Sequence, residues 1–203
     1  MIMTDTHVKH SIEESLTRAI SYQEYRTLVQ NLVAEGKSTG ELQTEALSNY
    51  SMLNDKRMKR LDKTTKLTEE AVAEIKSYNG DVTWLVLTES WCGDAAQTMP
   101  VINKVAALND NITMKVVLRD ENEALMNEFL TNGGKSIPKL IAIDNASGNV
   151  IGDWGPRPTK ATQLVNDYKA AHGKLTPEFK QDLQVWYNKD KGQNTVADLL
   201  KLV

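Results

Sequence analysis

The one cysteine of the chain, Cys92, lies where two sequence patterns meet. Residues 82–87 form an apolar run long enough for a buried strand, and residues 95–108 have the apolar spacing of a helix. We therefore expect Cys92 at the N-terminus of a helix, where free N–H groups and the helix dipole stabilise a thiolate. Asp94 opposes this effect, because a negative charge beside a thiol raises its pKa. The pattern favours a reactive thiol, and the alternative is an inert thiol packed inside the protein.

The composition limits the chemistry further. A single cysteine forms no disulfide within the chain, and the histidines His7, His10 and His172 lack the spacing of zinc ligands, so we expect no metal and no cofactor. The formal net charge of −3 argues against nucleic acid as a partner. No stretch approaches the roughly 18 apolar residues that a membrane helix needs, and residues 1–16 lack the apolar run of a signal peptide. We expect a cytoplasmic protein that binds neither nucleic acid nor membranes.

Alternating apolar segments predict a sheet flanked by helices. Four apolar runs have the length of buried strands, and they span residues 82–87, 112–118, 140–143 and 150–154. Helical patterns lie between or after them, at residues 95–108, 121–130 and 159–171. The first helix is a crossover between parallel strands, whereas the short turn at residues 145–148 joins the last two strands as an antiparallel hairpin. The fold class is therefore α/β, with a mixed sheet of four strands.

The two ends of the chain differ from this centre. Residues 11–66 are polar with a helical period, and the tail again has helix start signals. We divide the chain into a helical N-terminal extension, a central α/β domain and a helical C-terminal tail, which span residues 1–66, 67–172 and 173–203. A basic run between residues 56 and 66 predicts a solvated helix face, and an acidic partner is the less favoured alternative.

Several short motifs follow one another in the central domain. Trp91-Cys92-Gly93 follows the first strand, and Pro100 lies inside the next helix. Ile137-Pro138 precedes the third strand, and Gly155 follows the last one. In this order the motifs resemble the thioredoxin family, over about residues 68–172 of the chain. The resemblance implies a thioredoxin-like fold in which Pro138 is cis and lies against the reactive cysteine, and in which the backbone of Ile137 pairs with an extended substrate.

The resemblance also implies which side chains surround the thiol. Trp91 is expected on the rim of the site, Asp120 matches an aspartate that is common there, and Gly155 matches a glycine beside the active site. For Arg157 an ordinary solvated arginine is the favoured interpretation, and the alternatives are that it offsets the charge of Asp94 or binds a carboxylate of a small thiol. With Cys92 as the catalytic residue, the expected substrate-binding residues are Trp91, Gly93, Asp94, Ile137, Pro138, Gly155 and Arg157.

Two departures from the family pattern divide the functional hypotheses. Ala95 replaces the second active-site cysteine, and Val86 replaces a buried aspartate that moves protons in thioredoxins. Without a second thiol Cys92 forms a mixed disulfide but closes no internal one, which excludes a dithiol mechanism within one chain.

One hypothesis is monothiol thiol–disulfide exchange with a protein or peptide partner, resolved by an external low-molecular-weight thiol. The other is a non-catalytic binding module for an extended peptide or a protein. A weaker third hypothesis joins two chains through a disulfide between their Cys92 residues. The sequence leaves open whether the protein is an enzyme.

Overall fold

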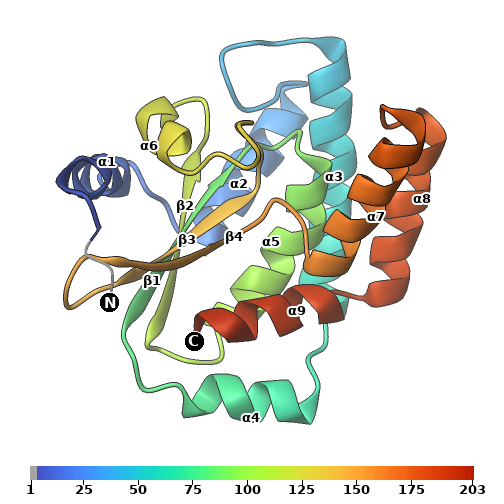
Figure 1. Cartoon of the computed structure of the whole chain (residues 1–203). Helices are drawn as coiled ribbons and strands as arrows, with labels where there is room; N and C mark the ends of the chain where they lie inside the picture. The colour runs from blue at the N-terminus through green and yellow to red at the C-terminus, as the bar shows by residue number, and fades with distance from the viewer. Residues whose placement is uncertain (1–3) are drawn as a thin grey trace.

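A mixed four-stranded sheet forms the centre of the protein (Figure 1). The structure, a computed structural model, describes residues 4–203. The strands are β1 (Val82–Thr88), β2 (Ile112–Leu118), β3 (Lys139–Asp144) and β4 (Val150–Trp154). They lie in the order β2-β1-β3-β4, where β1 and β2 are parallel and the other two neighbouring pairs are antiparallel. This arrangement confirms the predicted α/β class, the parallel crossover and the closing hairpin.

Helices surround the sheet and account for most of the remaining chain. They are α1 (Thr6–Leu16), α2 (Tyr22–Ala34), α3 (Glu45–Thr64), α4 (Glu69–Ser77), α5 (Gly93–Ala106), α6 (Glu123–Glu128), α7 (Thr159–His172), α8 (Pro177–Asp190) and α9 (Gln193–Leu199), followed by a short 3₁₀ helix, η1 (Leu200–Leu202). The predicted N-caps act as expected, since Thr68 and Thr176 accept hydrogen bonds from the first turns of α4 and α8. We did not predict that α1 begins as early as Thr6, with Asp5 as its cap.

Strand β1, which leads to the thiol, is a central and deeply buried strand of the sheet. It pairs with β2 on one side and β3 on the other, and Leu85, Val86 and Leu87 are fully buried. A run of apolar residues is the pattern expected for a strand that is covered on both faces. Helix α5 starts five residues after the strand ends at Thr88, so the cysteine between them is held by two rigid elements.

The N-terminal extension packs on the same core as the sheet. Ile12 of α1, Tyr25 of α2 and Met58 of α3 belong to the main hydrophobic cluster. The Arg26 guanidinium, which is only 3% exposed, joins α2 to α3 through ion pairs with Asp55 (2.9 Å) and Asp62 (3.2 Å). Tying two helices together through a buried charge requires that both of its partners stay in place.

The segment between α1 and α2 also closes one edge of the sheet. Ile20 and Val116 exchange two backbone hydrogen bonds, 2.9 Å and 2.8 Å long, on the outer side of β2. An unpaired strand edge would expose these N–H and C=O groups to other chains. The extension therefore covers one point of this sheet edge in addition to packing on the core.

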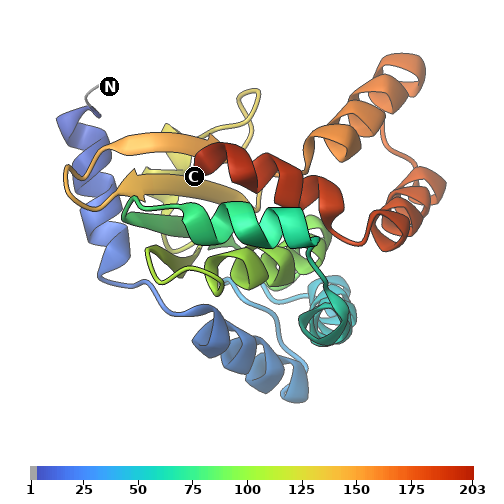
Figure 2. The same ribbon diagram turned by 90° about the horizontal axis from the view of Figure 1, so that it is seen from below.

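Helices α7 and α8 stand apart from the main core. Figure 2 shows this pair projecting from the side of the molecule, whereas α9 runs back alongside the sheet. The apolar residues that the two helices share form a small cluster of their own, built around Ala161, Val165, Leu183 and Tyr187. Val196 and Leu199 of α9 belong instead to the main cluster. In the C-terminal tail, α9 thus packs on the main core, whereas α8 packs with α7 in the separate small cluster.

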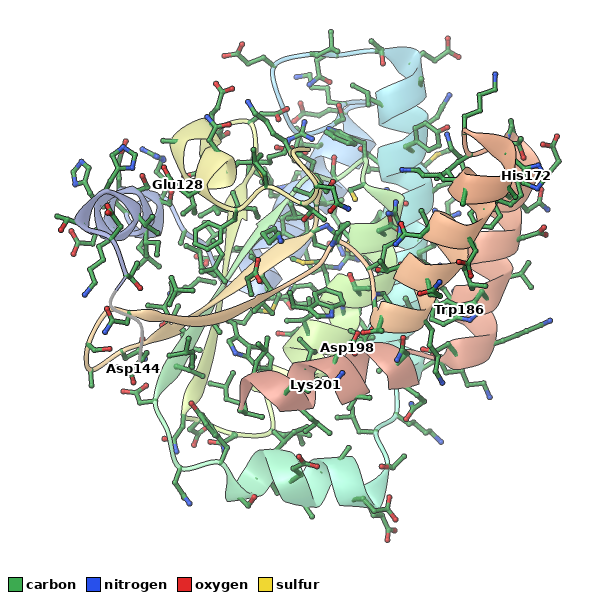
Figure 3. All side chains as sticks on the ribbon, in the orientation of Figure 1. Glu128, Asp144, His172, Trp186, Asp198 and Lys201 are labelled. Carbon is green, nitrogen blue, oxygen red and sulfur yellow. The ribbon has the colours of Figure 1, made fainter. Side chains whose placement is uncertain are left out.

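Asp198 of α9 anchors the start of α7 (Figure 3). Its carboxylate accepts hydrogen bonds from the Thr159 N–H (2.7 Å), the Thr159 hydroxyl (2.8 Å) and the Trp154 indole N–H (3.3 Å). The residue that precedes α7 is Pro158, which offers no capping side chain. Asp198 supplies from another helix the negative charge that a helix N-terminus favours, and these hydrogen bonds help to lower its pKa.

We predict that Asp198→Ala lowers the free energy of unfolding by about 1–3 kcal/mol, because it leaves the buried indole N–H of Trp154 without an acceptor and removes the two hydrogen bonds at the start of α7. Urea denaturation followed by circular dichroism measures the change. The loss should shrink as the pH falls through the depressed pKa of Asp198, since the wild-type carboxylate is then protonated. Asp110→Ala, at an exposed position, is the control. Equal stability of the two variants would contradict the anchoring role.

Candidate functional site

Cys92 caps the N-terminus of α5. Its backbone is extended, and α5 begins at the next residue, Gly93. The sulfur accepts a hydrogen bond from the Ala95 N–H (3.4 Å) and donates its own proton to the carbonyl of Ile137 (3.2 Å). The thiol thus lies at a helix start, as its sequence context predicts, and it contacts the backbone of Ile137 rather than a second sulfur.

Two proline segments meet beside the thiol. The Ile137–Pro138 peptide bond is cis, and Pro138 is buried directly before β3. A second cis bond, Gly155–Pro156, follows β4 and was not predicted. Gly155 has a φ of +119°, and a side-chain carbon there would overlap the carbonyl oxygen of Pro138, so only glycine fits at this close approach.

Asp94 joins three separate parts of the chain. Its carboxylate forms an ion pair with Arg157 (2.6 Å) from the segment between β4 and α7. It also accepts a hydrogen bond from the hydroxyl of Tyr187 in α8 (3.0 Å). Burial raises the pKa of Asp94, while Arg157 and Tyr187 act in the opposite direction. The structure therefore brings Arg157 to Asp94, and it adds Tyr187, which the sequence analysis missed.

Burial controls the acidity of the thiol. Cys92 is only 9% exposed. Burial is the largest cause that raises its pKa to about 12, and the negative charge of Asp94 is the next. The N–H groups of Ala95 and Asp94 and the Arg157 cation lower it by less. Burial thus outweighs the helix N-terminus and holds Cys92 as a neutral thiol, the protonation state that belongs to the packed alternative stated from the sequence.

The turn before Cys92 is held by the N-terminal extension. Ser90 and Thr39 exchange hydrogen bonds, with the Ser90 N–H donating to Thr39 (2.8 Å) and the Thr39 N–H donating to Ser90 (2.9 Å). The Ser51 hydroxyl lies 2.6 Å from that of Ser90, and the Asn54 amide donates to the Ser90 carbonyl (2.8 Å). These small polar residues cover the turn, and nothing in their local sequence signals this role.

Trp91 lies on the rim of the site, partly exposed, as expected. The Arg119 guanidinium lies 4.9 Å from the centre of its ring and also pairs with Asp120 (2.7 Å). The Asp120 N–H donates to the carboxylate of Glu89 (2.9 Å). Glu89 is fully buried, and burial raises its pKa. This acid was not predicted, whereas Val86, at the position of the family's buried aspartate, is an ordinary core residue.

Residues 4–203 contain neither a cluster of metal ligands nor a membrane-spanning helix. In this range no three side chains of histidine, cysteine, aspartate or glutamate converge as metal ligands. Within the same range, no helix has both the length and the apolar character needed to span a membrane.

The sheet order, the cysteine at the start of α5 and the cis proline before β3 define a thioredoxin-fold protein with a single site thiol. A family model described as Thioredoxin matches residues 40–169, which is more than half of the chain. The chain belongs to the thioredoxin family. The match begins inside the N-terminal extension, and it includes all eight predicted site residues.

Two solved structures share the fold of nearly the whole chain. A protein of unknown function from Pseudomonas aeruginosa is 17% identical, with a TM-score of 0.57 over 90% of this chain and 96% of that one. An HIV epitope-scaffold is also 17% identical, with a TM-score of 0.56 over 90% of this chain and 97% of that one. No curated protein matches the chain. At this identity the two structures show the fold alone.

We predict that the folded chain reacts slowly with iodoacetamide. Only the thiolate is alkylated, and the pKa of Cys92 is raised to about 12. At neutral pH the native chain should therefore react at least about tenfold more slowly than the chain unfolded in guanidinium, whose thiol has an ordinary pKa. Mass spectrometry of timed samples measures both rates. A native rate that equals the unfolded rate would show that the helix N-terminus outweighs burial.

Proposed function

We propose that the protein carries out monothiol thiol–disulfide exchange through Cys92 after α8 has moved away from the start of α5. The observation that supports this most is the polar cluster at the thiol. The N–H groups of Ala95 and Asp94 lower the pKa of the thiol, and the Asp94–Arg157 ion pair lies beside it. Removing an ion pair from water costs free energy. A cysteine that is only a packed core residue does not need such a pair beside it.

The exchange conserves the number of thiols and disulfides. The Cys92 thiolate attacks one sulfur of a disulfide R–S–S–R′, forms Cys92–S–S–R and releases R′–S⁻, which takes a proton from water. Ala95 supplies no second thiol, so an external thiolate attacks the sulfur of R, forms a new disulfide with it and releases Cys92 as a thiolate. The N–H groups at the start of α5 stabilise the charge on the departing sulfur.

The backbone of Ile137 has a second use in this scheme. Its carbonyl accepts the S–H proton of Cys92 in the resting protein. Once the sulfur carries a bond to a partner it has no proton to donate, and the carbonyl is free to accept a hydrogen bond from an extended partner chain. In the proposed scheme, formation of the mixed disulfide is therefore coupled to binding of the partner.

Helix α8 covers the site mainly through polar contacts. Its Tyr187 bonds to Asp94, its Gln184 bonds to Gln97 (2.9 Å), and its Asn188 bonds to Arg60 (2.7 Å). The α7–α8 pair is flanked by Gly155 and Gly192, both with positive φ, and its apolar cluster is separate from the main core. A segment with few apolar contacts opens locally at a low free energy. Opening lowers the pKa of Cys92, because burial is the main cause of its rise.

The second candidate function is a binding module without turnover. It is favoured by the pKa of about 12 for Cys92, which leaves almost no thiolate in the closed protein at neutral pH. The absence of a second thiol at Ala95 points the same way. In this alternative the thioredoxin fold serves as a scaffold, and Cys92 is a packed core residue. An intermolecular disulfide between two copies would require the same opening of α8.

We predict that Cys92→Ser abolishes mixed-disulfide formation with dithiodipyridine, a neutral disulfide whose released thiol is followed by absorbance. In a chain that keeps Cys92, Tyr187→Phe should raise the reaction rate about tenfold over that of the wild-type chain. The substitution removes one hydrogen bond to the buried Asp94 carboxylate and so favours movement of α8 away from the site. Tyr168→Phe is the matched control, because the Tyr168 hydroxyl bonds to Thr176 within the α7–α8 pair (3.1 Å). A folded Tyr187→Phe chain whose Cys92 stays unreactive would support the binding module instead.

A further inference from the structure

The seam between α3 and α8 carries positive charge that no carboxylate neutralises. We define this α3–α8 seam by four cations, which are Arg57, Arg60, Lys66 and Lys191. The two acids of the neighbouring stretch of α3, Asp55 and Asp62, are turned to the α2 side, where both pair with Arg26. None of the four seam cations forms an ion pair with any residue in the range 4–203.

A cavity of about 430 Å³ lies along the seam. Its cationic lining residues are Arg60, Lys66 and Lys191, and Tyr187 and Asn188 of α8 form the opposite wall. No aspartate or glutamate lines it among the described residues. A hollow that contains three cations and no anion lowers the energy of any negatively charged group that enters it.

One wall of the cavity holds a polar group that lacks a partner. Thr65 lines the cavity and is only 5% exposed, yet its hydroxyl oxygen forms no hydrogen bond. A buried hydroxyl without a partner is unfavourable unless a ligand or water completes it. The Thr65 oxygen itself is closed to solvent, so a carboxylate in the cavity accepts its hydrogen bond only after the Thr65 side chain turns toward the cavity.

Arg57 extends the positive seam to the thiol. Its guanidinium lies 4.0 Å from the position that a side-chain carbon on Gly93 would occupy, directly beside Cys92. Its one hydrogen bond to a side chain goes to Asn54 (2.9 Å). Burial lowers the pKa of Arg57, and the positive charge of the neighbouring Arg60 lowers it further. An anion between them would relieve the repulsion of the two charges.

The spacing of the charges indicates the shape of the ligand. Along α3 the chain rises about 10 Å from Arg57 to Thr64, at about 1.5 Å per residue. An extended peptide covers this length in about three residues, at about 3.3 Å each. A single phosphate would reach only one end of the seam. We propose that the α3–α8 seam binds a short acidic segment of a peptide or protein partner, with its carboxylates on Arg57, Arg60 and Lys191 and beside Thr65.

This assignment deepens the proposed exchange, because it places an acidic partner segment against Gly93, next to Cys92. The partner class is then a chain whose cysteine lies close to several glutamates or aspartates. Tyr187 lines the same cavity and also bonds to Asp94, so a ligand in the seam contacts the residue that holds α8 over the thiol.

The test is the binding of a fluorescein-labelled tetraglutamate peptide, measured by fluorescence anisotropy on the full-length Cys92→Ser chain. This variant has no thiol to exchange, so the peptide-binding result does not depend on whether the proposed exchange occurs. We expect binding that weakens at high salt, because the contacts are between charges. Arg60→Gln and Lys191→Gln should each weaken it by about tenfold, and Thr65→Val by a smaller factor.

Lys76→Gln removes one positive charge from exposed α4, away from the seam, and should leave the affinity unchanged. Tetralysine carrying the same label should not bind. Circular dichroism and urea denaturation identify any variant that fails to fold, and Arg60→Lys then replaces Arg60→Gln with a milder loss expected. Equal affinities for Arg60→Gln and Lys76→Gln would overturn the proposal, and so would inorganic phosphate that displaces the peptide as well as free tetraglutamate does.

Discussion

The arrangement around the thiol depends on the contacts that the buried carboxylate of Asp94 makes. It lies in the first turn of α5, where a negative charge suits the helix dipole, but it is removed from most of the solvent. A charge in such a place needs partners, and the chain supplies them from Arg157 and Tyr187. These two contacts pull the segment after β4 and helix α8 onto the start of α5. Cys92 lies directly before α5 and is itself buried.

The N-terminal extension completes the enclosure from the other side. Arg26 fixes α3 against α2, and α3 then presents Ser51 and Asn54 to the turn at Ser90. The turn that carries the thiol is therefore bounded by residues from before the sheet and from after it. The family match likewise begins at residue 40, within the N-terminal extension.

Much of the fold could be predicted because its signals are local. Apolar runs located the four strands, and threonines at helix starts such as Thr68 and Thr176 located the caps. The position of Cys92 followed from the change of pattern between β1 and α5. The cover over the thiol could not be predicted in this way. Tyr187 is 93 residues from Asp94 and Ser90 is 51 from Thr39, and no periodicity connects such pairs. Burial of Cys92 involves residues that are distant in the sequence, so its raised pKa could not be predicted from the neighbouring residues alone.

The enclosure of Cys92 also determines how the chain meets oxidants. Peroxides attack thiolates and convert them first to sulfenic acid, and then, unless a nearby thiol traps this product, to sulfinic and sulfonic acids that are not readily reversed. Ala95 provides no such trap, so an exposed Cys92 would be two oxidation steps from irreversible loss. A neutral, covered sulfur escapes the first step. The same contacts that slow the reactions of Cys92 therefore protect the one thiol of the chain from oxidation.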